Sequence, residues 1–197
     1  MNPLTRPLII GIGGTTRSGS SSERLLKFAL SAAEAAGARA EIFAGPLLDL
    51  PMYAPDRNER APAAKRMIAA LRQSDGVILA SPGYHGTVSG LIKNALDYTE
   101  DLSKDAAPYL QGKAVGCVAC AGGWQAAVST LASLRSIVHA LRGWPTPLGV
   151  CVNSGQPVFR PDGELADPML AGKLRTLAEE VVEFARMRGL RAARAAA

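Results

Sequence analysis

Near its N-terminus the chain reads LIIGIGGTTRSGSSSERLLKFAL, from residue 8 to residue 30. The apolar run at residues 8–12 predicts a short buried strand, and Gly13 and Gly14 end it. A helical pattern of apolar residues follows at about residues 22–36 and stops at Gly37. A strand that passes through a glycine-rich loop into a helix indicates an α/β fold.

The alternation of strand and helix continues along the chain. Further strands are expected at residues 39–44, 76–81, 114–121 and 148–153, and further helices at about residues 63–73, 88–98, 124–142 and 168–187. This pattern predicts a flavodoxin-like doubly wound α/β fold, with a five-stranded parallel sheet in the order 2-1-3-4-5 and helices on both faces. In such sheets ligands lie beyond the carboxyl ends of the strands, so we expect the functional residues after the first, third and fourth strands.

Length and composition exclude several classes of protein. The chain has 197 residues, of which 48% are hydrophobic and 20% are charged, which suits one globular domain and excludes a disordered chain. We expect a single domain over residues 1–187 and a basic tail over residues 188–197 that frays. Neither a signal peptide nor an apolar run of about 20 residues is evident. We therefore expect a cytoplasmic protein that does not contact a membrane.

The net charge of +5 raises the question of nucleic-acid binding. The last twelve residues contain four arginines and no acidic residue, which leaves +1 for the rest of the chain. The sequence also lacks a basic stripe with interleaved aromatic residues and a recognisable reading helix. Nucleic acid is therefore not an expected partner.

Cys117 and Cys120 form a C-x-x-C pattern, which raises the possibilities of zinc and of redox chemistry. Both lie in an expected strand, where residues i and i+3 point to opposite faces of the sheet. No second Cys or His pair completes a zinc site. We interpret both cysteines as small buried strand residues and expect no metal.

The loop after the first strand has the chemistry of a phosphate site. Hydroxyl groups and one guanidinium surround its glycines, and the candidate ligands are Thr15, Arg17, Ser20, Ser21 and Ser22. The following helix would add free N–H groups at its N-terminus. A terminal monophosphate, such as that of FMN, fits these groups.

Two nucleotide-binding motifs do not fit this loop, and one structural alternative does. The dinucleotide pattern G-x-G-x-x-G fails because Thr16 stands where the third glycine belongs, and the Walker pattern fails because Ser20 replaces the lysine. The remaining alternative is an ordinary serine-rich helix start, with Ser22 as the cap and a capping box from Ser20 to Glu23.

The segment after the third strand reads SPGYHGTVSGLIKNALDY, from residue 81 to residue 98. Pro82 is expected to end the strand, and a loop of small residues then presents Tyr84 and His85 at the carboxyl edge of the sheet. Such a loop could lie flat against a planar ring and offer it N–H groups. The alternative for His85 is a solvated loop residue without a function.

These two segments resemble the NADPH-dependent FMN reductase family of flavodoxin-like proteins. In that family a G-S-x-R-x-x-S-x-[NS] loop holds the FMN phosphate, and a P-E-Y-N-x-x-x-x-x-x-L-K-N-A-[IL]-D segment lines the flavin ring. The first motif is matched at Thr15, Arg17, Ser20 and Ser22, and the second at Pro82, Tyr84, Lys93, Asn94, Ala95, Leu96 and Asp97. The resemblance spans about residues 8–185.

The second motif also departs from the common family pattern. Gly83 and His85 replace its Glu and Asn, and the resulting form resembles flavin reductases that serve two-component monooxygenases. Relatives place a third loop near the pyrimidine edge of the flavin, which corresponds here to Gly122 and Gly123. Trp124, which follows, would be either a core residue at a helix start or part of the flavin surroundings.

The resemblance implies an NAD(P)H:flavin oxidoreductase that transfers hydride from NADPH or NADH to FMN and supplies reduced flavin to a partner such as a monooxygenase. It implies FMN contacts from the phosphate-loop residues already named and from Pro82, Gly83, Tyr84, His85, Gly86, Gly122 and Gly123. It also implies a homodimer or homotetramer. No catalytic residue is assigned, since hydride transfer belongs to the cofactors. The alternatives are an FMN-retaining reductase of quinones, azo compounds or metal ions, and an electron-carrier flavodoxin.

Overall fold

The computed structural model describes residues 6–195, with side chains up to Arg191. The strands are β1 (Leu8–Gly13), β2 (Arg39–Ala44), β3 (Gly76–Tyr84), β4 (Thr87–Val88), β5 (Ala114–Ala121), β6 (Trp144–Pro145) and β7 (Val150–Asn153). The α-helices are α1 (Ser21–Ala35), α2 (Pro62–Gln73), α3 (Gly90–Asp97), α4 (Trp124–Ala140) and α5 (Pro168–Ala195), and two 3₁₀ helices are η1 (Gly45–Leu48) and η2 (Tyr98–Leu102).

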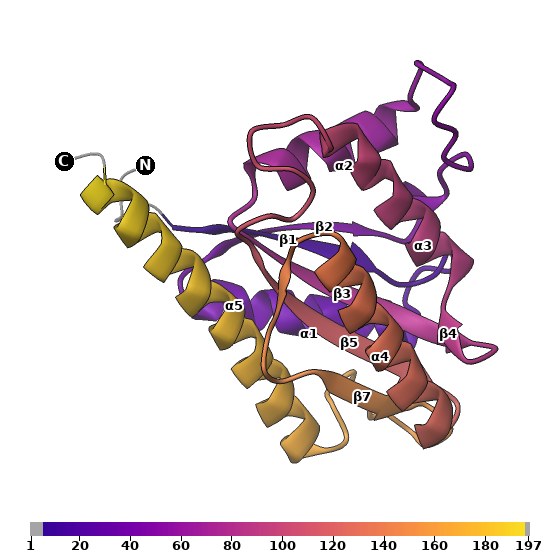
Figure 1. Ribbon diagram of the computed structural model, residues 1–197. Coiled ribbons are helices and arrows are strands. Elements are labelled where there is room, and N and C mark those ends of the chain that lie inside the picture. The colour runs from indigo at the N-terminus through magenta and orange to yellow at the C-terminus, as the bar shows by residue number, and fades with distance from the viewer. Residues whose placement is uncertain (1–5, 196–197) are drawn as a thin grey trace.

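The sheet has the predicted parallel order. Strand β1 pairs with β2 and β3, β3 pairs with β5, and β6 and β7 both pair with the other side of β5. Helices α1 and α5 cover one face of the sheet, and α2, α3 and α4 cover the other (Figure 1). Each face has its own buried apolar core, so the fold is flavodoxin-like.

Local sequence explains how the chain turns from α1 into β2. Gly37 has a φ of +91°, a conformation that glycine adopts without strain. Its N–H donates to Glu34 O at 2.8 Å, and the N–H of Ala38 donates to Ala33 O at 3.0 Å. These two bonds form a Schellman motif, which ends the helix and directs the chain into the sheet.

The prediction that the third strand ends at Pro82 was wrong. Strand β3 continues through Pro82 to Tyr84 and then folds back as a hairpin with β4. His85 and Gly86 form the two-residue turn, with φ of 50° and 89°, as a type I′ turn requires. Helix α3 consequently starts at Gly90, with Ser89 as its cap, rather than at residue 88.

Two other expectations differ from the structure at the C-terminal end. The strand expected at residues 148–153 begins only at Val150, as β7, and a separate short strand, β6, precedes it, with Pro147 in the segment between the two. Proline cannot donate to a strand ladder, which accounts for the interruption. The last helix was expected to end at residue 187, but α5 continues to Ala195, so residues 188–195 of the expected tail are helical, and residues 196–197 lie outside the described residues.

Cys117 and Cys120 lie on opposite faces of the sheet, as predicted. Cys117 belongs to the core under α2, α3 and α4, whereas Cys120 belongs to the core under α1 and α5. Burial raises the pKa of the Cys117 thiol to about 12. In the described part of the chain, no helix combines the length and the apolar character that crossing a membrane requires.

Candidate functional site

A cavity of about 150 Å³ opens at the carboxyl edge of the sheet, where β1, β3, β5 and β7 end. We call it the hydroxyl-lined cavity. Its wall is formed by Thr15, Arg17, Ser20, Ser21, Ser22, Pro82, Gly83, Tyr84, Cys120, Ala121, Gly122 and Ser154. The structure thus brings most of the predicted site residues, which come from three separate loops, to one place.

The loop between β1 and α1 is shaped by its own hydroxyl and amide groups. The N–H of Gly14 donates to Ala80 O on the neighbouring strand at 3.2 Å. Thr15 Oγ1 accepts the N–H of Arg17 at 3.2 Å and lies 3.1 Å from Arg17 O, to which it donates. This tight turn leaves the exposed Arg17 side chain at the rim of the cavity.

Ser20, rather than Ser22, caps α1. Its Oγ accepts the N–H of Glu23 at 3.4 Å, while the Glu23 carboxylate accepts the N–H of Gly19 at 2.9 Å. The buried Glu23 also pairs with Lys27 at 2.6 Å. The expected helix cap therefore exists beside the expected anion site. Because Lys27 offsets the charge of Glu23, that carboxylate does not oppose a bound anion.

Arg17 gives the hydroxyl-lined cavity its charge. It is the only Arg, Lys, Asp or Glu in the described wall, and no carboxylate of the described residues lies within 4.0 Å of it. Ser21 and Ser22 are the first two residues of α1, so their N–H groups have no acceptor within the helix. An anion at this point would meet a free guanidinium, hydroxyl groups and free amides.

The β3–β4 hairpin supplies the second part of the wall. Pro82, Gly83 and Tyr84 line the cavity, with the Tyr84 side chain 52% exposed. His85 and Gly86 form the tip of the hairpin and are not among the lining residues. The structure therefore separates two members of this predicted group from the other three.

The third part of the wall comes from the ends of β5 and β7. Gly122 lines the cavity, as predicted, but Gly123 does not. Cys120 and Ser154 were missed by the sequence analysis. Ser154 follows β7, and its N–H donates to Ala121 O at 2.7 Å, which fastens this loop to the end of β5. Ligands of such sheets lie beyond the carboxyl ends of the strands, and the same rule applied to the last strand would have predicted Ser154.

Cys120 is a buried thiol of this wall. Burial raises its pKa, and a hydrogen bond from Ser154 partly offsets that rise. The thiol is therefore protonated at neutral pH and acts as a small apolar wall group. Trp124, one residue after the predicted glycine pair, is 61% exposed and does not line this cavity.

The remaining residues of the second sequence motif hold the fold together. Asn94 Oδ1 accepts the N–H of Tyr53 at 2.8 Å, and Asn94 Nδ2 donates to Leu50 O and Pro51 O at 3.2 and 3.0 Å. Lys93 and Asp97 form an ion pair at 2.5 Å along α3. Asn94 thus ties α3 to the loop after η1, Lys93 and Asp97 pair within α3, and none of the three lines the hydroxyl-lined cavity.

Sequence comparisons match the chain to a known family and to two reductases. A sequence profile of the family described as NADPH-dependent FMN reductase matches residues 7–156. The NADPH azoreductase of Bacillus sp. (strain OY1-2) is 26% identical over 160 residues, which are 81% of this chain and 82% of that protein. The FMN-dependent NADPH-azoreductase of Staphylococcus aureus is 33% identical over 113 residues, but the match spans only 56% of each chain.

A solved structure supports the fold. The flavoenzyme NAD(P)H:(acceptor) oxidoreductase FerB from Paracoccus denitrificans superposes with a TM-score of 0.75 at 20% sequence identity. The superposition covers 92% of this chain and 98% of FerB. At that identity the likeness concerns the fold, and the function must be argued from the site and the family.

Proposed function

Because the chain belongs to the NADPH-dependent FMN reductase family, we propose that it binds FMN in the hydroxyl-lined cavity and reduces it with hydride from NADPH or NADH. The observation that carries this proposal is the position of Arg17, a free cation beside a row of hydroxyls at the start of α1. FMN, once bound, supplies the chemistry by accepting hydride from the nicotinamide and passing the electrons on.

The residues of the wall fit the phosphate of FMN. Arg17 offsets part of its charge, and the hydroxyls of Ser20, Ser21 and Ser22 can donate to its oxygens, while the Thr15 hydroxyl donates to Arg17 O and shapes the loop. Backbone N–H groups at the start of α1 complete the set. One guanidinium therefore offsets part of the phosphate charge, and neutral hydroxyl and amide donors hydrogen-bond its oxygens.

The hairpin and the loop at Gly122 fit the ring end of the cofactor. Pro82, Gly83, Tyr84 and Gly122 line the cavity with little side-chain bulk apart from the Tyr84 ring. The cavity of about 150 Å³ is smaller than the roughly 300–1,000 Å³ of pockets that enclose a whole ligand. Part of FMN therefore stays open to solvent, where a nicotinamide can approach it.

Two fates of the electrons are compatible with this site. In the first, reduced FMN leaves and serves a partner enzyme such as a flavin-dependent monooxygenase. In the second, FMN stays bound and passes electrons to a quinone, an azo compound or a metal ion. The names of the two curated relatives, both azoreductases, favour the second candidate.

Titration with free FMN separates these fates. The oxidation rate of NADPH by FMN-loaded protein is measured in air with increasing free FMN. If FMN is a substrate, the rate rises with free FMN and saturates. If FMN is retained, the rate is independent of free FMN and rises when an azo dye or a quinone is added. Protein that oxidises neither NADPH nor NADH under any of these conditions contradicts both candidates.

A further inference from the structure

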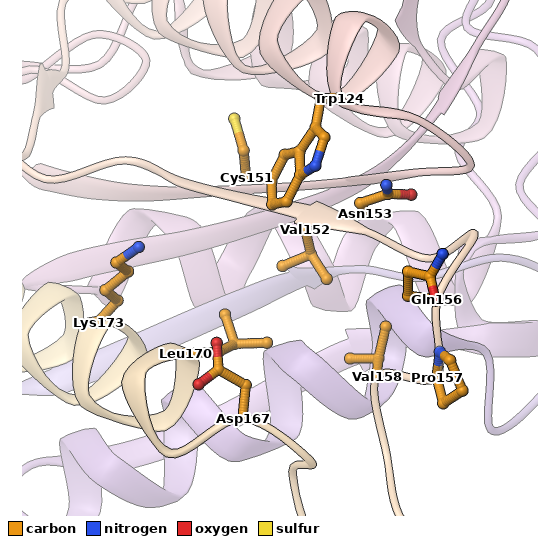
Figure 2. Close-up of a pocket in the computed structure, with 10 residues that line it drawn as sticks. All are labelled: Trp124, Cys151, Val152, Asn153, Gln156, Pro157, Val158, Asp167, Leu170 and Lys173. Atoms are coloured by element: carbon orange, nitrogen blue, oxygen red, sulfur yellow. The ribbon is translucent and has the colours of Figure 1, made fainter.

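A second cavity, of about 210 Å³, lies along β7 and shares no lining residue with the hydroxyl-lined cavity. Figure 2 shows its walls: Trp124 projects from α4 toward β7, Leu170 and Lys173 come from α5, and the loop after β7 supplies Val158. Nothing in the proposed flavin chemistry uses these side chains. We call this space the tryptophan-lined cavity.

The wall of this cavity combines polar and apolar side chains, and one side of it is aromatic. Trp124 is 61% exposed and, among the described residues, stacks with no other aromatic ring. Val152, Val158 and Leu170 line the cavity on the α5 side of β7, and Trp124 lines it on the α4 side (Figure 2). A large indole that stays exposed beside aliphatic side chains provides a surface for a flat apolar molecule.

One carboxylate and one ammonium group line this cavity. Asp167 Oδ1 accepts the N–H of Met169 at 2.8 Å, so this carboxylate is occupied in capping the start of α5. The ammonium group of Lys173 has no carboxylate of the described residues within 4.0 Å. Lys173 is thus the group of this wall that can pair with an anion, while the Asp167 carboxylate keeps its negative charge at the start of α5.

The loops after β5 and β7 separate the two cavities. The N–H of Ser154 donates to Ala121 O at 2.7 Å, and a Cβ on Gly155 would lie 2.7 Å from Gly122 O. Backbone this close leaves no room for a side chain between the loops. A ligand in the tryptophan-lined cavity would thus lie next to the flavin site without entering it.

We propose that the tryptophan-lined cavity binds a flat aromatic molecule of one or two rings that carries an acidic group. The ring system lies along the edge of β7, in contact with Trp124 on one side and with the aliphatic side chains on the other, and the acidic group pairs with Lys173. The size agrees, since an apolar cavity of roughly 150 Å³ already holds benzene. This ligand site goes beyond the proposed FMN reduction and does not depend on it.

Calorimetric titration of the FMN-loaded protein with naphthalene-2-sulfonate tests the site. We expect one-to-one binding that is at least about tenfold tighter than that of neutral naphthalene-2-methanol, because a charge-assisted contact to Lys173 adds to the ring burial. Lys173→Gln should weaken sulfonate binding by about fivefold or more and leave the neutral compound unchanged. Lys65→Gln, at an exposed position on α2, is the matched control and should change neither.

Each cavity has its own cysteine, so protection from alkylation shows which cavity the naphthalene probe occupies. Cys151 lines the tryptophan-lined cavity and Cys120 the hydroxyl-lined one. At pH 8.5, naphthalene-2-sulfonate should slow the alkylation of Cys151 by iodoacetamide and leave that of Cys120 unchanged, without releasing FMN. No binding, equal binding to the Lys173→Gln variant, protection of Cys120 or release of FMN would each overturn the proposal.

Discussion

At the scale of single residues, Arg17 carries the charge of the hydroxyl-lined cavity. Replacing it with Ala removes the only guanidinium of the described wall, and we expect FMN affinity to fall by roughly 10- to 100-fold, since a charge-assisted hydrogen bond contributes about 1.5–3 kcal/mol. The change is measured from the quenching of FMN fluorescence during titration of the apoprotein.

A matched control distinguishes this effect from a general loss of positive charge. Arg66 lies on α2 and pairs with Glu41 at 2.9 Å, away from the cavity. Arg66→Ala should bind FMN with unchanged affinity. Equal FMN affinity in Arg17→Ala and the native protein would contradict the phosphate assignment.

Gly83 is a second informative residue, because it departs from the Glu of the family pattern. A Cβ at this position would lie 2.5 Å from Thr130 Oγ1 and 2.9 Å from Ala121 Cβ. Thr130 is fully buried and its hydroxyl donates to Thr87 O at 3.2 Å, so it cannot move aside freely. The close approach of the hairpin to α4 therefore explains why glycine stands here.

Gly83→Ala should lower the melting temperature of the apoprotein by several degrees. Overpacking in a filled region destabilises a protein by about 1–3 kcal/mol, and for a chain of this size each kcal/mol corresponds to about 2–4 °C. Gly122→Ala is the matched control, because nothing lies within 4 Å of a Cβ there. Equal melting temperatures of these two variants, by differential scanning calorimetry, would contradict the packing argument.

At the scale of elements, the start of α1 combines two roles. Ser20 caps the helix through the N–H of Glu23, and Ser21 is the first helical residue, with its hydroxyl in the cavity wall. The cap stabilises the protein whether or not a ligand is present. The hydroxyl of Ser21 matters only when an anion is bound.

The two serines should therefore respond differently to truncation. Ser20→Ala should destabilise the apoprotein by about 1 kcal/mol, the usual contribution of a cap. Ser21→Ala should leave the stability of the apoprotein unchanged and weaken FMN binding. Urea unfolding of the apoproteins and FMN titration measure the two quantities, and a stability loss from Ser21→Ala equal to that from Ser20→Ala would contradict this division.

At the scale of the whole molecule, the ends of distant elements are tied together at the edge of the sheet opposite the cavity. Arg186 of α5 donates to Ala36 O at the end of α1 at 2.6 Å, and Arg6 donates to Ala38 O at 2.7 Å. The basic residues near the C-terminus thus take part in the fold. The carboxyl edge of the sheet, in contrast, is formed by loops whose N–H groups and hydroxyls are available to a ligand.

Removal of FMN should consequently lower the stability of the whole domain. At a free FMN concentration 100 times the dissociation constant, binding adds about 2.7 kcal/mol, which corresponds to roughly 5–10 °C in melting temperature. Thermal melts with and without FMN measure this shift. In Arg17→Ala, the same FMN concentration should produce a clearly smaller shift, and an undiminished one would contradict the assigned site.

Much of this architecture could be predicted from spacing alone. The alternation of polar and apolar residues at 39–44 predicted β2, and the continuous apolar run at 114–121 predicted β5, both with their observed bounds. The phosphate loop was predicted for a similar reason, since its glycines, hydroxyls and Arg17 are consecutive in the sequence. Pro82 misled the prediction, since the hairpin beyond it depends on pairing with Thr87 and Val88.

The folded chain alone decided which loop residues meet. Cys120 and Ser154 join the hydroxyl-lined cavity because β5 and β7 are neighbours that end at the same edge. His85 leaves it because a type I′ turn places it at the hairpin tip. Trp124 and Lys173 lie 49 positions apart yet share a cavity, because α4 and α5 flank β7 from opposite faces. Such contacts join residues far apart in the chain, whereas strand and helix patterns arise from neighbours a few positions away.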